Sequence, residues 1–297
     1  MRRAALIYNP KSGRQRHGEV LERIVSTLQG GGFLVELTPT AYAGQAVELA
    51  RGLAAARAVE AVFAFGGDGT AREVAAGLLG TPVALGVLPG GTANLLALAL
   101  GLPRDPVEAA AVLCKAPVRA FDVGMAKGLA GEHPFLMMTS AGLDATVLAA
   151  LDVELKWRFG EAAIVWQGIR EWWRYSYPNI EVIADGERLC ATFAAVANLP
   201  FYAGSFRLAP EASPDSHRLE LVLFRGRGRW ATLGFILDLL RSAHVRRRDV
   251  EIRKVDEVLF AGPAGAEAQI DGDLCEERLP VRVRLAEEQL RVLFPKA

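Results

Sequence analysis

The sequence has no excess of charge of either sign. Its 297 residues include 34 lysines and arginines and 34 aspartates and glutamates, so the formal net charge is zero. A protein that binds nucleic acid through a strongly basic surface is therefore not expected. Apolar residues make up 51% of the chain and charged residues 23%, which is typical of a folded globular protein and not of a disordered one.

Cysteine, histidine and long apolar runs are also scarce. The three cysteines and four histidines are scattered and form neither a C-x-x-C nor an H-E-x-x-H motif, so we expect no disulfide framework, no zinc site and a reducing compartment. No apolar run approaches the roughly 20 residues of a membrane span. The run at residues 4–8 is too short for a signal peptide and predicts a strand. We therefore expect a cytoplasmic protein that contacts membranes only peripherally.

A glycine-rich stretch, Gly66-Gly67-Asp68-Gly69-Thr70, follows the apolar run 61–65 and precedes a helical pattern. It predicts a strand, a tight glycine turn and a helix start. Its glycines allow positive φ and let a ligand approach the main chain closely. Thr70 and Glu73 fit a capping box, with Thr70 as the N-cap and Glu73 bonding back to it. The free N–H groups of such a helix start attract phosphate.

Asp68 lies in this anion-attracting turn, although it carries a negative charge. One interpretation is that it binds Mg²⁺ or takes a hydroxyl proton beside the phosphates. The other is that Asp-Gly simply forms a good turn and Asp68 caps the local backbone.

Strands and helices alternate along the first 120 residues. The predicted strands are 4–8, 33–37, 61–65 and 83–87, and the predicted helices are 16–28, 45–56, 71–79, 95–100 and 106–114. This alternation predicts an α/β domain over residues 1–120, with a doubly wound, mostly parallel sheet that binds ligands at the carboxyl ends of its strands.

From residue 121 the pattern changes to short β-branched runs. The predicted strands are 135–138, 180–183, 193–197, 219–224, 258–261, 268–270, 281–285 and 290–294, and the predicted helices are 157–173 and 230–244. They predict an antiparallel β-sandwich domain over residues 121–297. Its last strand could instead return to the first domain, and its sheet edges could pair two copies into a homodimer.

Neither the P-loop motif nor a G-x-G-x-x-G motif opening a helix is present. Three other motifs do occur in order, Asn9-Pro10-Lys11-Ser12-Gly13, Gly66 to Thr70, and Pro89-Gly90-Gly91-Thr92-Ala93-Asn94. Together they resemble the diacylglycerol kinase catalytic family, which includes sphingosine, ceramide and bacterial lipid kinases and is more distantly related to NAD kinases and phosphofructokinases. The resemblance continues through Gly142 to Ala145, Val196 to Asn198 and Asp271-Gly272-Asp273, and covers essentially the whole chain.

The resemblance implies that the first domain binds ATP with Mg²⁺. The candidate ATP-binding residues are Asn9, Ser12, Gly13, Thr40, Gly66, Gly67, Asp68, Gly69, Thr70, Glu73, Thr92 and Asn94. Asn9, Thr40 and Asn94 taken singly could equally serve only as turn or cap residues.

The resemblance also implies a catalytic base in the second domain, where the family has the Glu of an Asp-Gly-Glu turn. Here that position is Asp273, one methylene shorter, and the alternative is that Asp271-Gly272 only forms a hairpin turn. Bacterial members bind a structural Mg²⁺ through a segment that corresponds to residues 215–220. Ser216 replaces one of its ligands, which leaves Asp215 as the substitute candidate.

Two stretches bear on the acceptor. Ala162, Trp166, Ile169 and Trp173 form a stripe at helical spacing among arginines, which suits either a lipid headgroup interface or a core-facing helix. A basic cluster could meet anionic lipid or be a solvated turn. It comprises Arg241, His244, Arg246, Arg247 and Arg248.

These features lead to a functional hypothesis with two alternatives. By resemblance, the protein is an ATP-dependent lipid kinase that phosphorylates a lipid hydroxyl at the membrane surface, with diacylglycerol as the leading acceptor, Asp273 as the base and Asp68 near the metal. One alternative is a kinase of a soluble acceptor such as NAD. The other is a nucleotide-binding module that has lost catalysis.

Overall fold

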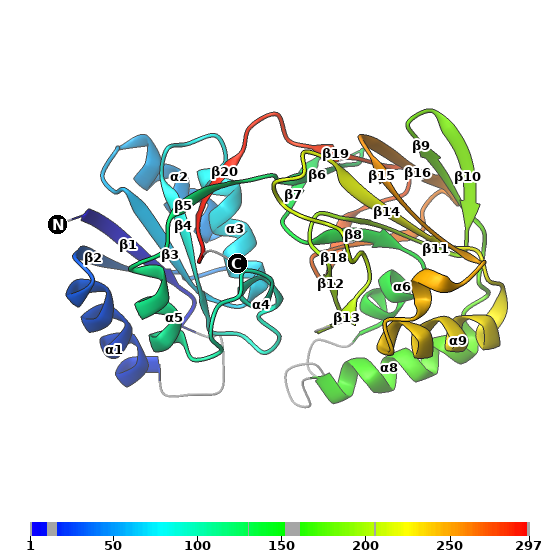
Figure 1. Ribbon diagram of the computed structural model, residues 1–297, viewed down its shortest axis with the longest axis horizontal. Coiled ribbons are helices and arrows are strands. Elements are labelled where there is room, and N and C mark those ends of the chain that lie inside the picture. Colours follow the sequence, from blue (N-terminus) through cyan, green and yellow to red (C-terminus); the bar gives the residue numbers. More distant parts are fainter. Residues whose placement is uncertain (1, 11–16, 130, 152–160, 205, 296–297) are drawn as a thin grey trace. The chain divides into compact units, whose positions relative to one another are not determined.

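The computed structural model describes residues 2–10, 17–129, 131–151, 161–204 and 206–295. The chain forms two compact units, Met1–Asp122 together with Glu287–Ala297, and Val123–Ala286 (Figure 1). Each unit has its own sheets and its own buried core.

The first unit contains one six-stranded sheet. Its strands, in spatial order, are β2 (Phe33–Pro39), β1 (Arg2–Tyr8), β3 (Ala61–Gly66), β4 (Ala84–Pro89), β20 (Leu290–Leu293) and β5 (Val118–Phe121). The first five run parallel, and β5 runs antiparallel to β20. β3 and β4 are buried at every position, as expected for central strands of a parallel sheet with helices on both faces.

The described residues of this unit form the helices α1 (His17–Gly30), α2 (Gln45–Ala55), α3 (Asp68–Leu78), α4 (Leu95–Ala99) and α5 (Pro106–Leu113). The chain steps one way from β1 to β2 and the other way from β2 through β3 to β4, so right-handed crossovers place α1 on one face and α2 and α3 on the other. α2 and α3 pack closely because Gly77 has no side chain, since a Cβ there would lie 2.5 Å from the carbonyl oxygen of Val47.

The second unit contains two six-stranded sheets in which neighbouring strands run antiparallel. One sheet has the order β10 (Glu187–Ala191), β9 (Ile180–Ala184), β16 (Glu257–Gly262), β19 (Val281–Leu285), β6 (Gly124–Lys127) and β7 (Glu132–Phe135). The other has the order β15 (Val250–Val255), β14 (Leu219–Phe224), β11 (Phe193–Ala197), β8 (Met138–Ala141), β17 (Glu267–Ile270) and β18 (Asp273–Arg278). A short hairpin pairs β12 (Phe201–Tyr202) with β13 (Phe206–Arg207).

Alternating side chains of the two sheets form the core of the sandwich, which includes Val196, Leu221, Phe260 and Val283. β11 and β14 are buried on their other face as well, where a second cluster contains Phe224 and Phe235. Where this unit is described, its helical segments are α6 (Leu143–Ala149), α8 (Glu161–Arg174), α9 (Gly228–Leu240) and the 3₁₀ turn η1 (His244–Arg246). Across the part of the chain described above, no helix combines the length and the apolar character needed to cross a membrane.

The predicted fold class is confirmed, because a parallel sheet with helices precedes an antiparallel sandwich. Several predicted boundaries are wrong. The predicted helix 230–244 ends at Leu240, since Ser242 takes a positive φ of 55° that stops the helix. Helix α6 and strands β5, β6, β10, β15 and β18 were not predicted, because they are short or carry too many charged residues for a clear apolar pattern.

Candidate active site

Four loops of the first unit leave the same edge of the sheet, because they follow the carboxyl ends of the parallel strands β1, β2, β3 and β4. Backbone hydrogen bonds join neighbouring strand ends. The amide of Asn9 donates to the carbonyl of Phe65 at 3.3 Å, and the amide and hydroxyl of Thr40 donate to the carbonyl of Tyr8 at 2.9 and 3.4 Å. The structure therefore brings Asn9, Thr40 and the Gly66 turn to one edge.

The two glycine motifs pack directly against each other. The amide of Gly90 donates to the carbonyl of Gly66 at 2.8 Å. A Cβ on Gly91 would lie 2.5 Å from the Cα of Gly67, so no larger residue fits there without moving the backbone. Gly67 does not use the positive φ that glycine allows, since its φ is −83°; the close approach of two loops requires these glycines.

The predicted capping box is also wrong. Helix α3 begins at Asp68 with Gly67 as its N-cap, so Thr70 lies within the first turn, where its side chain packs against Gly66. The Glu73 carboxylate accepts a hydrogen bond from the amide of Ala46, at 3.3 Å, in the first turn of α2. The glycine turn is tight enough for the helix to start two residues before Thr70.

Asp68 caps a different helix. Its Oδ2 accepts a hydrogen bond from the amide of Leu95 at 3.0 Å, and its Oδ1 accepts one from the amide of Leu96 at 2.9 Å. These are the first two residues of α4, so Asp68 joins the loop after β3 to the loop after β4. Neither interpretation of Asp68 from the sequence included this long-range cap.

Asn94 closes the second glycine loop. It has a left-handed backbone with φ 51°, its side-chain Oδ1 accepts from the amide of Gly91, and its Nδ2 donates to the carbonyl of Gly91, both at 2.8 Å. The turn interpretation of Asn94 is therefore supported. Thr92, at the tip of this loop, is exposed.

The start of α3 can hold an anion. Gly67 has no side chain to cap the helix, so no side chain at that position competes for the N–H groups of the first turn. Helix N-termini after glycine-rich turns bind phosphate through such groups. Gly69 lies in this first turn, whereas Ser12 and Gly13 lie outside the described residues.

The second unit holds the other predicted carboxylates. Asp271 and Gly272 both have positive φ, 51° and 85°, and form the tight turn between β17 and β18. The Asp271 carboxylate is 7% exposed and accepts three backbone N–H groups, from Leu136, Met137 and Met138, at 2.8 to 2.9 Å. Asp271 therefore has a structural role in the turn, and Asp273 follows it as the half-buried first residue of β18.

A hydrogen-bonded chain of side chains supports this turn, and sequence reasoning missed it. The Asp144 carboxylate accepts from the hydroxyl of Ser140, Ser140 Oγ accepts from Gln269 Nε2 at 2.7 Å, and Gln269 Oε1 accepts from the amide of Gly272 at 2.8 Å. Desolvation by burial raises the pKa of Asp144. The available signal was the position of Asp144 in the Gly142 to Ala145 motif.

The segment around Asp215 does not fit a structural Mg²⁺. Asp215 is exposed and accepts a hydrogen bond from Ser213, while Arg218 holds the segment through an ion pair of 2.9 Å with Asp256. Among the residues with assigned positions, no group of three or more His, Cys, Asp or Glu side chains could hold a metal ion.

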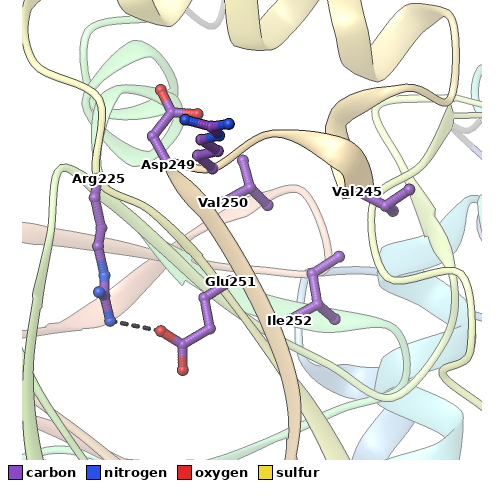
Figure 2. A pocket seen from close by; sticks show the side chains of 7 residues that line it. Arg225, Val245, Asp249, Val250, Glu251 and Ile252 are labelled. Atoms are coloured by element: carbon purple, nitrogen blue, oxygen red, sulfur yellow. Dashed lines mark hydrogen bonds and ion pairs between the residues drawn. The ribbon is translucent and has the colours of Figure 1, made fainter.

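A cavity of about 480 Å³ lies elsewhere on the second unit. It is lined by Arg225, Val245, Arg248, Asp249, Val250, Glu251 and Ile252. Figure 2 shows Arg225 reaching across it to an ion pair with Glu251. None of the predicted site residues lines this cavity, so it is not the candidate active site.

The sequence matches two known families in succession. Residues 3–126 match the Diacylglycerol kinase catalytic domain, and residues 137–294 match the YegS C-terminal NAD kinase beta sandwich-like domain. The chain belongs to the diacylglycerol kinase catalytic-domain family. The recognition made from the sequence motifs is confirmed, and this member of the family is a kinase, which implies ATP as phosphoryl donor.

Relatives of this kinase match along most of its length. A "Probable lipid kinase YegS-like" of Chromohalobacter salexigens is 33% identical over 91% of this chain and 86% of its own. A "Diacylglycerol kinase" of Bacillus subtilis is 27% identical over 92% and 90%. A crystal structure from Bacillus anthracis superposes with a TM-score of 0.82, at 22% identity, and covers 99% of this chain and 97% of that one. At that identity the last match supports the fold alone.

Proposed function

We propose that this kinase transfers the γ-phosphate of ATP to the hydroxyl of a membrane lipid, and that diacylglycerol is converted to phosphatidic acid. In this proposal residues 1–120 bind the nucleotide and residues 121–297 bind the lipid, apart from β20, which completes the first sheet. The observation that carries the proposal is the pair of glycine loops at the carboxyl edge of the first sheet, packed together beside the start of α3.

The donor side rests on backbone groups. The side chains of Asp68 and Asn94 hold the two loops in place, and the N–H groups of Gly90 and Gly91 bond within the loops. We therefore assign the phosphates to the first-turn N–H groups of α3 and to the exposed Thr92. Fixed N–H donors stabilise the charge that develops on a transferring phosphoryl group without having to reorganise during the reaction.

The loop that contains Asp68 suits a Mg²⁺ ion bound partly by the nucleotide phosphates better than a Mg²⁺ ion bound by protein groups alone. Kinase Mg²⁺ is bound by one or two carboxylates together with substrate phosphates, and Asp68 is the half-buried carboxylate of this loop. When bound, the ion neutralises phosphate charge. Asp215 offers a single exposed carboxylate, and we assign it no part in the reaction.

The acceptor side requires a base. We assign this role to Asp273, which takes the proton of the lipid hydroxyl as the hydroxyl oxygen bonds to the γ-phosphorus and the bond from that phosphorus to the β,γ-bridging oxygen breaks. ADP leaves with the electrons of the broken bond. The buried Asp271 and the Gln269 side chain fix the turn that carries Asp273.

The choice of a lipid acceptor is supported by the names of the relatives, a diacylglycerol kinase and a probable lipid kinase. The test is transfer of labelled phosphate from ATP to diacylglycerol in mixed micelles, with wild type, Asp273→Asn and Asp273→Glu. Glu276→Gln is the matched control, because Glu276 is an exposed carboxylate on the same strand. Asp68→Ala is less informative, since it also removes the cap of α4.

We expect labelled phosphatidic acid from wild type, a loss of about 10²-fold or more in kcat for Asp273→Asn, partial retention for Asp273→Glu, and no change for Glu276→Gln. If an assay with NAD gives labelled NAD phosphate and the lipid stays unlabelled, the acceptor is a soluble molecule and not a lipid. ATP binding without transfer to either would identify a non-catalytic module.

A further inference from the structure

Helix α8 buries polar side chains and exposes apolar ones, which is the reverse of a helix that packs its apolar face on a protein core. Gln167 is buried at 5% exposure and bonds at 2.9 Å to Glu171, whose side chain is 13% exposed. The apolar side chains point outward instead: Val165, Trp166, Ile169 and Trp173 are 51 to 65% exposed. The sequence left open whether this stripe faces a core or a lipid headgroup region, and the burial of the described side chains excludes the core.

Helix α9 extends this exposed surface, because it lies beside α8 within the second unit (Figure 1). The indole Nε1 of Trp172 donates to the carbonyl of Arg229 at 2.8 Å, and the Trp172 and Trp230 rings meet edge to face at 5.6 Å. Trp230 is 68% exposed, although it packs on Trp172. We call Val165, Trp166, Ile169, Trp173 and Trp230 the tryptophan face.

Positive charge surrounds the tryptophan face. The Arg229 guanidinium lies 4.8 Å from the centre of the Trp173 ring, and Arg170, Arg174 and Arg227 are exposed on the same two helices or next to them. Among the described side chains of α8 and α9, Glu171 bonds to Gln167 and lies 3.9 Å from Arg170, and Asp238 pairs with Arg247.

Only part of the basic cluster predicted from the sequence is exposed to solvent. His244 is fully buried and bonds to the carbonyl of Leu208 at 2.9 Å, and Arg247 is paired with Asp238 and Asp249. Arg241, Arg246 and Arg248 are exposed.

We propose that the tryptophan face docks the kinase on a membrane that contains anionic phospholipid. Indole rings prefer the boundary between headgroups and acyl chains, where one side of the ring is apolar and its N–H is wet. Arginines at that depth attract anionic headgroups, and a helix with an apolar outer face and a basic border lies in the plane of the interface. The inference deepens the proposed lipid kinase function by naming the surface through which it reaches its substrate.

The test is sedimentation of the full chain with vesicles of phosphatidylcholine alone and of phosphatidylcholine with phosphatidylglycerol. The variant is Trp166→Ser with Ile169→Ser, and the matched control is Leu34→Ser, which removes an apolar side chain of similar exposure, 54%, from β2 of the first unit. Because all three substituted side chains are exposed, both proteins should fold as wild type does.

We expect wild type and Leu34→Ser to bind the anionic vesicles, with binding reduced at high salt, and the double variant to bind about tenfold or more weakly. Brominated phospholipids should quench the tryptophan fluorescence of wild type. Equal binding by the double variant would overturn the proposal. So would absence of vesicle binding together with a dimer that the double variant abolishes, which would assign the face to a second copy of the chain.

Vesicle binding is measured without ATP or turnover, so it is independent of the test of the proposed function. A protein that binds vesicles through this face and phosphorylates no lipid would retain the docking surface and refute the lipid kinase. A protein that phosphorylates lipid in detergent micelles but does not bind vesicles would support the lipid kinase and refute the docking surface.

Discussion

Asp68 in the first unit and Asp271 in the second both precede a glycine, and both accept backbone N–H groups from a distant loop. Asp68 accepts two from α4 and stays half-buried, whereas Asp271 accepts three and is 7% exposed. In the first unit the Asp68 loop leads into α3, whose N-cap Gly67 has no side chain to bond the N–H groups of the first turn, whereas in the second unit the Asp271 turn carries Asp273. In the proposed function, such N–H groups bind the phosphates and the Asp273 carboxylate takes the hydroxyl proton.

The largest expected effect comes from breaking the second-unit turn with Asp271→Ala. Three buried N–H groups would lose their acceptor, which should lower the free energy of unfolding by about 4 kcal/mol, measured by urea denaturation. Asp185→Ala is the matched control. Asp185 also precedes a glycine, has a φ of 49° itself and accepts two backbone N–H groups, but it lies in an exposed turn. We expect Asp185→Ala to lower the free energy of unfolding by about 1 kcal/mol. Equal losses would mean that burial of the Asp271 turn is unimportant.

The next largest effect should come from Gly91→Ala in the first unit. The added Cβ would lie 2.5 Å from the Cα of Gly67, so the two loops must separate, and we expect a loss of about 3 kcal/mol and weaker ATP binding. Gly52→Ala, on the exposed side of α2 with nothing within 4 Å, should instead stabilise the protein by about 1 kcal/mol. Urea denaturation and nucleotide titration measure both, and ATP binding by Gly91→Ala at wild-type strength would contradict the role of loop packing.

The smallest effect concerns Asp144, which supports the Asp273 turn through Ser140 and Gln269. Burial raises the pKa of Asp144 in the folded protein above its ordinary value of 3.8, so the folded state binds this proton more tightly than the unfolded state does. Stability should therefore fall as pH rises from 3.8 to the raised pKa, by about 1.4 kcal/mol for each pH unit between the two values, and stay level above it.

Asp144→Asn should remove that pH-dependent component while other titrating groups remain. Urea midpoints measured across acidic pH for both proteins give the comparison, with Asp256→Asn as an exposed control. An unchanged pH profile in Asp144→Asn would show that Asp144 does not set the pH dependence of stability.

The sequence predicted the order of strands and helices well where apolar runs are long, as at β3 and β4, and it placed the motif residues after strand ends. It could not predict which groups the carboxylates bind. The bonds of Asp68 reach residues 27 and 28 positions away, and those of Asp271 reach residues more than 130 positions away, so they depend on the completed fold. Local turn chemistry therefore predicted the turn at Asp271-Gly272, but it could not predict the distant partners of either carboxylate.

The stripe on α8 shows a second limit of the sequence. Helical periodicity places Trp166, Ile169 and Trp173 on one face, but the same spacing serves a buried face and an exposed one. Only the polar residues opposite, Gln167 and Glu171, distinguish the two cases, and their burial depends on contacts with other elements.

The place of β20 affects how the protein is made. This strand lies between β4 and β5, yet the ribosome reaches it only after the whole second unit has been synthesised. At ~5–20 residues per second, the first sheet waits many seconds with the edge of β4 exposed. A truncated chain that stops at Asp122 would keep this edge permanently open to pairing with other chains. The first unit therefore matures last, although most of it is translated first.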